Sequence, residues 1–193
     1  MHKTKLYGIL FRLTHPAKTQ LKKVVGNTVL TFEELTTVMT QIEACLNSRP
    51  LYPISNDPLD LNVLTPGHFL VGAPLTSLPQ NDLSDINIGR LTRYQLVTQI
   101  IQSFWRRWSR EYLSQLQQRP KWQRSYTSDI KIGSLVLLVE DNTAPLHWRM
   151  GRVVDVYKGN DNVVRVVSVK TTSNVIKRSI KRVCLLPVAA ENA

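Results

Sequence analysis

Short apolar runs separated by turn-forming residues mark the C-terminal third of the chain. β-Branched residues dominate these runs, which is typical of strands buried in a sheet. The breaks between them contain Asn, Asp, Gly and Pro, residues that favour tight turns. The pattern predicts strands over 134–139, 147–157, 163–170 and 175–178, followed by a last apolar segment over 180–186. Short antiparallel strands at such close spacing predict a small β-barrel.

A capping motif opens the clearest helix of the first half. Thr31 and Glu34 are placed so that each side chain accepts a hydrogen bond from the other residue's backbone N–H. Apolar positions between 32 and 46 then recur every three or four residues, so one face of this helix is expected to be buried. Residues 47–50 end it, because proline disfavours helical geometry in the residue before it. Residues 18–25 fit a shorter helix with one basic face.

The segment from 51 to 90 is rich in proline and turn formers, which discourages both helix and strand. It is nevertheless too apolar for a free linker, with leucines throughout and the sequence FLV at 69–71. We expect an extended strap that lies across another surface. A short turn of helix is predicted at 65–70, where Pro66 suits the first helical position.

A long amphipathic helix is predicted from 90 to 118. Apolar and aromatic residues, among them Trp105, Trp108 and Tyr112, form one stripe at helical spacing. Arginines lie mainly off this stripe. We interpret the aromatic residues as core, whereas the arginine face fits phosphate contact and simple solvation equally well.

The charge balance changes the picture, because 25 lysines and arginines against 14 acidic residues give a net charge of +11 over 193 residues. Such an excess favours a polyanionic partner, nucleic acid before anionic membrane. A basic surface that serves only solubility is the alternative. Between 147 and 182, nine basic residues stand against two acidic ones, so the predicted barrel holds most of the excess. Alternation along the strands, as at Arg152 and Val153, would place charged and apolar groups on different faces.

Contact with a nucleic-acid backbone needs basic side chains but no base-reading code, so we expect nucleic-acid binding of low sequence specificity. The alternative for the barrel is that its charges form only a solvated outer face. The residues expected to contact nucleic acid are Arg106, Arg110, Arg149, Arg152, Lys158, Arg165, Lys170, Lys177, Arg178, Lys181 and Arg182.

Other features argue against several kinds of site. Cys45 and Cys184 have apolar neighbours and are expected to be buried thiols, which indicates neither a disulfide nor a metal site. Four scattered histidines give no metal-ligand spacing, and we expect no cofactor and no small-molecule substrate. No apolar run approaches the roughly 18 residues of a membrane span, and the N-terminus lacks the pattern of a signal peptide. We therefore expect an intracellular location, the nucleus included.

Several stretches together resemble one family. Residues 30–35 (LTFEEL), 41–51 (QIEACLNSRPL) and 64–72 (LTPGHFLVG) are similar to the end of a BEL/Pao-type retrotransposon integrase. Residues 104–108 (FWRRW), 133–136 (GSLV), 148–153 (WRMGRV) and 159–166 (GNDNVVRV) resemble the C-terminal domain of unknown function that follows the integrase core. The likeness runs from about Ala17 to Val188.

The resemblance implies a ribonuclease H-like core that uses two Asp and one Glu to bind two divalent metals. In the family the Glu lies in a Gly-Gly-Leu/Ile-Trp-Glu motif shortly before the segment that is AKTQLK here, at 17–22. Counting back, Leu10 stands in place of the Trp and Phe11 in place of the Glu. The two Asp belong to a region that would precede Met1. We therefore expect no catalytic residues and no independent enzymatic activity.

These expectations define an α+β fold in several parts. Residues 1–75 are expected to be a helical remnant of the integrase core. Residues 76–131 form a linker and the long amphipathic helix, 132–188 a small basic Src-homology-like β-barrel, and 189–193 a tail.

Two functions remain open at this point. The first is a non-catalytic DNA-binding fragment derived from a retrotransposon polyprotein. The second is a protein-interaction scaffold, with homo-oligomers among its forms, in which Trp105, Trp108, Tyr112 and the strap have lost the partner surface that covered them. An open reading frame without selected function is a third alternative.

Overall fold

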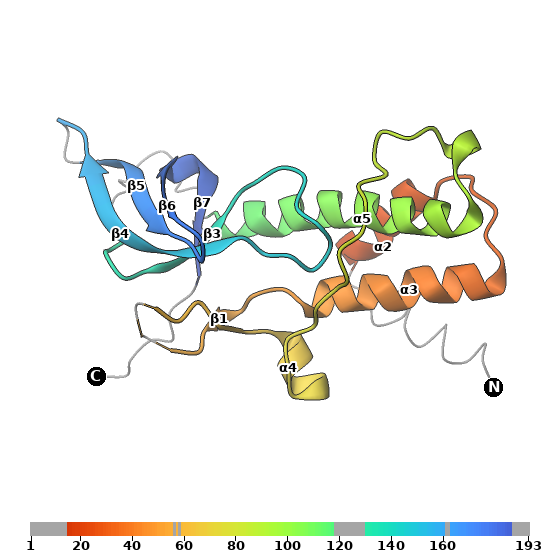
Figure 1. The fold of residues 1–193 in the computed structure, drawn as a ribbon, viewed down its shortest axis with the longest axis horizontal. Coiled ribbons are helices and arrows are strands. Elements are labelled where there is room, and N and C mark those ends of the chain that lie inside the picture. The colour runs from red at the N-terminus through yellow and green to blue at the C-terminus, as the bar shows by residue number, and fades with distance from the viewer. Residues whose placement is uncertain (1–14, 56, 58, 118–129, 161–162, 187–193) are drawn as a thin grey trace.

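The computed structural model describes residues 15–55, 57, 59–117, 130–160 and 163–186. A group of helices at one end and a β-sheet at the other are joined by one long helix, α5, which runs between them (Figure 1). The predicted tail at 189–193, the first fourteen residues and most of the segment between α5 and the sheet lie outside the described residues.

Three helices build the first core. They are α2 (His15–Val25), α3 (Phe32–Asn47) and α5 (Arg93–Leu116), and α5 packs against both of the others. The predicted capping box is confirmed, since the Thr31 N–H donates to the Glu34 carboxylate and the Glu34 N–H donates to the Thr31 hydroxyl. Side chains that include Met39, Ile42 and Phe104 are buried between the helices, as their spacing predicts.

The segment between α3 and α5 folds back along the body, as expected for a strap. It forms a short hairpin from β1 (Tyr52–Pro53) and β2 (Val63–Leu64), then α4 (Pro66–Val71) and the 3-10 helix η1 (Ile88–Arg90). Two buried side chains of α5 hold the extended part of the strap through hydrogen bonds. Gln102 accepts a hydrogen bond from the Leu83 N–H, and Gln99 donates to the carbonyls of Leu83 and Ile86.

The C-terminal residues form one antiparallel sheet. Its strands are β3 (Leu135–Leu138), β4 (Met150–Lys158), β5 (Val164–Lys170), β6 (Val175–Ser179) and β7 (Val183–Leu185), in the order β6-β5-β4-β3-β7. The 3-10 helix η2 (Ile180–Arg182) links the two outer strands. Within the described residues β6 pairs only with β5 and β7 only with β3. The sheet is therefore open, and the prediction of a closed barrel is not confirmed: the strands are present, but no hydrogen-bonded pairing joins β6 to β7.

The sheet shares its core with the helical part. Alternate residues of β3 point to opposite faces, so that Val136 and Leu138 pack within the sheet while Leu135 and Leu137 pack on Leu113 of α5. Val63 of β2 packs in the same cluster as Leu135, Leu137 and Leu113. The buried clusters thus contain residues from both sides of the boundaries that the sequence placed after residues 75 and 131.

A cluster of aromatic side chains packs where the sheet meets the helical part. Trp148, just before β4, lies against Trp105, Trp108 and Tyr112 of α5, with ring centroids 4.9, 5.8 and 5.5 Å away, respectively. Its indole N–H donates to the Ser48 hydroxyl at the end of α3. Trp105 is only 1% exposed. The hypothesis that these aromatic residues have lost their covering surface is therefore wrong, because Trp148 and the helices cover them.

Candidate nucleic-acid interface

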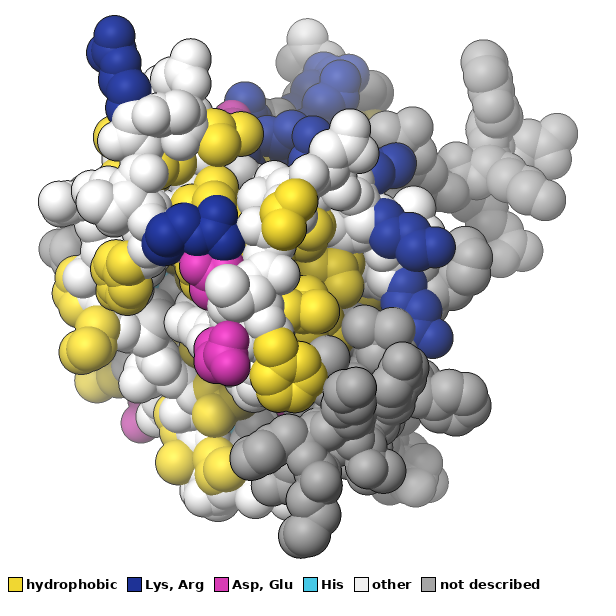
Figure 2. All heavy atoms as spheres, turned by 90° about the vertical axis from the view of Figure 1, so that its right-hand side faces the viewer, with side chains coloured by type: hydrophobic (Ala, Val, Ile, Leu, Met, Phe, Trp, Pro, Cys, Tyr) yellow, Lys and Arg dark blue, Asp and Glu magenta, His cyan; other side chains and the backbone are white. Residues whose placement is uncertain are grey.

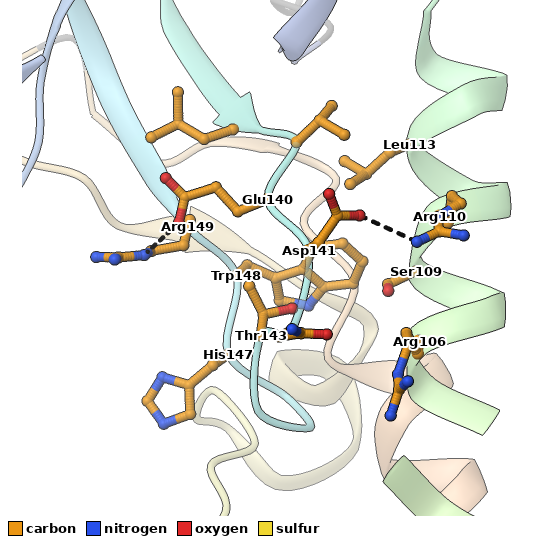
Figure 3. A pocket seen from close by; sticks show the side chains of 13 residues that line it. Arg106, Ser109, Arg110, Leu113, Glu140, Asp141, Thr143, His147, Trp148 and Arg149 are labelled. Atoms are coloured by element: carbon orange, nitrogen blue, oxygen red, sulfur yellow. Dashed lines mark hydrogen bonds and ion pairs between the residues drawn. The ribbon is translucent and has the colours of Figure 1, made fainter. Parts of the chain in front are cut away.

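Two consecutive carboxylates after β3 gather four arginines from separate elements. Asp141 accepts from Arg110 of α5 at 3.0 Å and from Arg182 of η2 at 3.4 Å. Glu140 accepts from Arg149, just before β4, at 3.0 Å and from Arg178 of β6 at 3.3 Å. Figure 3 shows the Arg110–Asp141 and Arg149–Glu140 pairs on the two sides of this loop. We call these four arginines, together with Arg106, the arginine cluster.

The cluster is open to solvent. More than half of the side-chain surface of Arg110, Arg149 and Arg182 is exposed, and that of Arg178 is partly exposed. Exposed ion pairs of this kind contribute at most about 1 kcal/mol each to stability. The pKa of Asp141 is held below its usual value by the hydrogen bonds from Arg110 and then Arg182, so this carboxylate is ionised at neutral pH.

A shallow depression of about 30 Å³ lies among these residues, and Arg106 lines it next to Arg110 (Figure 3). Guanidinium groups present several N–H donors in a planar fork that matches two oxygens of a phosphate. Five arginines face two carboxylates here, so the group keeps a net positive charge after its internal pairs are counted. The arginine cluster therefore suits a phosphate, whose oxygens would accept hydrogen bonds from the guanidinium N–H groups that Glu140 and Asp141 do not use.

Five other residues of the predicted interface lie on the surface but do not pair with Glu140 or Asp141 in any contact described above. Lys158, Arg165, Lys170, Lys177 and Lys181 are exposed on or beside the strands β4, β5 and β6 and the helix η2. The Lys177 ammonium sits 4.6 Å from the centre of the Tyr157 ring, and the Tyr157 hydroxyl bonds with Ser168. The structure therefore divides the eleven predicted residues into a cluster of five, a dispersed group of five and one buried residue.

The buried residue is Arg152, which is 5% exposed. Its guanidinium donates to the carbonyl oxygens of Ser55, Asp60 and Gly133 at 2.6 to 3.1 Å. The prediction that Arg152 faces outward and contacts DNA is wrong. Its strand faces the β1–β2 hairpin, and the carbonyls of that hairpin take the donors that a phosphate would need.

The sequence reasoning missed Glu140 and Asp141. The charge count began at residue 147, so it left out the two acids that organise the cluster. Over 132–188 the chain carries nine basic and four acidic residues, a net charge of +5. An acidic pair directly after a buried strand was the signal that could have shown where basic side chains converge.

Figure 2 shows the helical end of the molecule, where described lysine and arginine side chains lie among apolar, acidic and uncharged ones. Arg93 at the start of α5 pairs with Glu34 and also donates to the Val29 carbonyl. The described residues contain no group of three or more His, Cys, Asp or Glu side chains placed to hold a metal ion. No helix among them is long and apolar enough to cross a membrane.

One family model matches the second half of the chain. Residues 92–186 match the Family of unknown function (DUF5641). The match begins at Thr92, the N-cap of α5, and ends just after β7, so α5 and the sheet fall within one family unit. Neither the comparison with curated proteins nor the comparison with solved structures found a match.

Proposed function

We propose that this chain is a non-catalytic module that binds the backbone of duplex DNA through the arginine cluster. The single observation that carries the proposal is the convergence of Arg106, Arg110, Arg149, Arg178 and Arg182 from four separate parts of the fold around one loop. The net charge of +11 adds long-range attraction for a polyanion.

We further infer an origin in the C-terminal region of a BEL/Pao-type retrotransposon integrase. The sequence motifs support this origin, and the open sheet with η2 between its outer strands is compatible with a Src-homology-like barrel that is not fully closed. On this view α2 and α3 derive from the end of a ribonuclease H-like core. The product would bind DNA inside the cell without integrase activity of its own.

A salt titration tests the proposal. The full chain should bind a short labelled DNA duplex at low ionic strength, and the affinity should fall steeply as salt is added, because binding releases counterions from the phosphates. Absence of measurable binding at low salt would overturn the proposal.

Matched double variants locate the interface. Replacing Arg110 and Arg182 by Ala should weaken duplex binding about tenfold or more and reduce the salt slope by about two, one for each lost phosphate contact. Replacing Lys22 and Lys23, two exposed residues of α2, removes the same charge elsewhere and should have a much smaller effect. Equal losses in the two variants would show that only net charge matters. Asp141→Asn should strengthen binding, because it removes an ionised competitor for the same arginines.

A second candidate, self-association, is favoured by a specific feature of α4. Phe69, Leu70 and Val71 are 73%, 63% and 62% exposed, although α4 is anchored by the packing of Gly67 against Leu75 and the Asn47 carbonyl. Residues 61–81 contain no Asp, Glu, Lys or Arg. Two copies of a chain with a net charge of +11 repel each other, and the repulsion is smallest where the surface carries no charge. The exposed end of α4 at residues 69–71, which we call the α4 tip, is therefore where a second copy would dock.

Light scattering after size-exclusion chromatography tests that candidate. Self-association through α4 should appear as a concentration-dependent rise in mass that Leu70→Ser abolishes. Val175→Ser, at an exposed apolar position of the sheet, is the control and should leave the mass unchanged. A monomer at every concentration would exclude self-association through this tip.

A further inference from the structure

A second, larger cleft lies beside the arginine cluster. It lies between the strap and the loop that connects β3 to β4, with a volume of about 140 Å³. An engineered apolar cavity of about 150 Å³ accommodates benzene, so this cleft has room for one six-membered ring. Its lining includes the polar side chains of Gln80, Asp82, Ser84, Arg106, Asn142 and Thr143.

Hydrogen bonds from α5 fix the strap side of the cleft. The amide of Gln102 accepts from the Leu83 N–H at 2.9 Å and donates to the Asn81 carbonyl at 2.8 Å. Gln99 holds the next part of the strap through the Leu83 and Ile86 carbonyls, each at 2.7 Å. Because these glutamines are buried, this wall is in place before any ligand arrives, which reduces the entropic cost of binding.

The loop side is fixed in a different way. The Ser77 hydroxyl donates to the Pro145 carbonyl at 2.6 Å, which ties the strap to the loop. Thr143 accepts a hydrogen bond from the buried Trp105 indole at 3.2 Å. Asn142 has a φ of 64°, a left-handed turn conformation that Asn adopts more readily than most residues other than glycine.

The charges in the cleft favour a neutral polar ligand. Arg106 donates to the Ser84 hydroxyl, which in turn donates to the Asp82 carboxylate. The hydrogen bonds from Ser84 lower the pKa of Asp82, with a smaller contribution from Arg106, so the carboxylate is ionised at neutral pH. One negative and one positive group therefore share the cleft with amides and a hydroxyl. A phosphate would be repelled by Asp82, whereas a ring that carries both donors and acceptors would be satisfied.

Arg106 connects the two sites, because it lines both this cleft and the depression in the arginine cluster. A nucleic-acid strand that places one phosphate on the arginine cluster would bring the groups next to that phosphate to the mouth of the cleft. In a duplex the Watson–Crick edges of the bases are paired, so only an unpaired base can offer that edge to the cleft.

We propose that this cleft binds an unpaired pyrimidine base of a nucleic-acid strand whose phosphates lie on the arginine cluster. The inference rests on the proposed function and extends it from duplex backbone contact to capture of a single-stranded or locally opened segment. Asp82 and the amides of Gln80 and Asn142 would contact the edge of the base, while Arg106 stands between base and phosphate.

Two labelled strands of equal charge separate base binding from phosphate binding. The full chain is titrated at low salt with a thymidine strand of about ten nucleotides, a length within the usual range of single-strand sites, and with an abasic strand of the same length. We expect the thymidine strand to bind about three- to tenfold more tightly, the gain of one or two net hydrogen bonds. Equal affinity for the two strands would overturn the base site and leave backbone binding intact. If the chain bound neither of the two strands nor the duplex, both proposals would be overturned.

Variants then place the base in the cleft. Asn142→Gly removes the amide while suiting the left-handed backbone, and Gln80→Ala removes an exposed amide from the strap. Each should lower the thymidine affinity towards the abasic value and leave the abasic affinity unchanged. Gln115→Ala, on an exposed position of α5, is the matched control and should keep the full difference. A preference for thymidine that survives both cleft variants would show that the base binds elsewhere.

Discussion

Arg152 carries its positive charge into the contact between the sheet and the β1–β2 hairpin. Residues 55 and 60 lie 97 and 92 positions away in the chain, yet their carbonyls accept from its guanidinium. The buried Arg152 guanidinium donates to three carbonyls, and a hydrogen bond that involves a charged group contributes about 1.5–3 kcal/mol. At this scale the charge of a residue says less about its role than the acceptors that surround it.

Replacing Arg152 by Met tests this role. The apolar stem is kept while the donors are lost, so we expect the free energy of unfolding to fall by about 2–4 kcal/mol. Chemical denaturation measures it. Arg149→Met, at an exposed position three residues earlier, is the control and should change stability by less than about 1 kcal/mol. Similar effects of the two changes would contradict the structural role of Arg152.

Both cysteines are expected to be unreactive in the folded chain. Burial raises the pKa of the Cys45 thiol to about 12, and it raises that of Cys184 to about 12 as well. Because burial favours the neutral thiol, the reactive thiolate is scarce below that pH, and neither should react with a thiol reagent at pH 8. Denaturant should expose both within the same transition. Rapid labelling of one thiol in the native state would contradict the packing described for it.

At the scale of elements, the pairing of β4 with β5 depends on a very close approach at Gly151. A Cβ atom placed there would lie 2.5 Å from the Val169 side chain and 2.6 Å from the Lys170 carbonyl oxygen. The second of these atoms belongs to the backbone, so rotation of a side chain cannot relieve the clash. The two strands would have to separate, and β5 would lose part of its core contact.

Gly151→Ala is therefore expected to destabilise the chain by about 1–3 kcal/mol or more, the range of overpacking in a well-packed core. The midpoint of thermal unfolding and the near-ultraviolet circular dichroism would report the loss. Gly89→Ala is the control, because an added methyl there meets only the Asn87 side chain at an ordinary 3.5 Å. A neutral Gly151→Ala would mean that the two strands lie further apart than described.

Elements whose signals are local could be predicted from the sequence. The capping pair Thr31 and Glu34 is three residues apart, and α5 falls within the predicted range of 90 to 118. The strand positions followed from short apolar runs and their turns. The open sheet was not predicted, because closure depends on whether β6 and β7 meet, and no pattern within either strand records that.

Much of the candidate site lay beyond local signals. The convergence of Arg110, Arg149, Arg178 and Arg182 joins elements that are distant in the sequence, and charge counting could rank their region but not pair them. The burial of Arg152 and the position of Trp148 depend on contacts across roughly half the chain. A period of two along a strand says which residues share a face but not what covers that face.

At the scale of the whole molecule, the sheet depends on the helices for one of its faces. Leu135, Leu137, Cys184 and Leu186 pack against α5 and β2 rather than against other strands. A fragment of residues 132–193 would expose this face to water and lose the carbonyls of Ser55 and Asp60 that accept hydrogen bonds from Arg152. The same reasoning explains why α5 and the sheet fall within one family match.

We therefore expect the fragment 132–193 not to fold into a stable, uniquely packed sheet by itself. Its amide spectrum should be poorly dispersed and its unfolding non-cooperative, while the full chain should unfold in one transition. Adding a separate fragment of residues 1–131 should restore dispersion and duplex binding together, because that fragment supplies α5, the hairpin and the Arg106 and Arg110 side chains. A well-dispersed spectrum from 132–193 alone would show that the strands hold their own core without α5 and the hairpin.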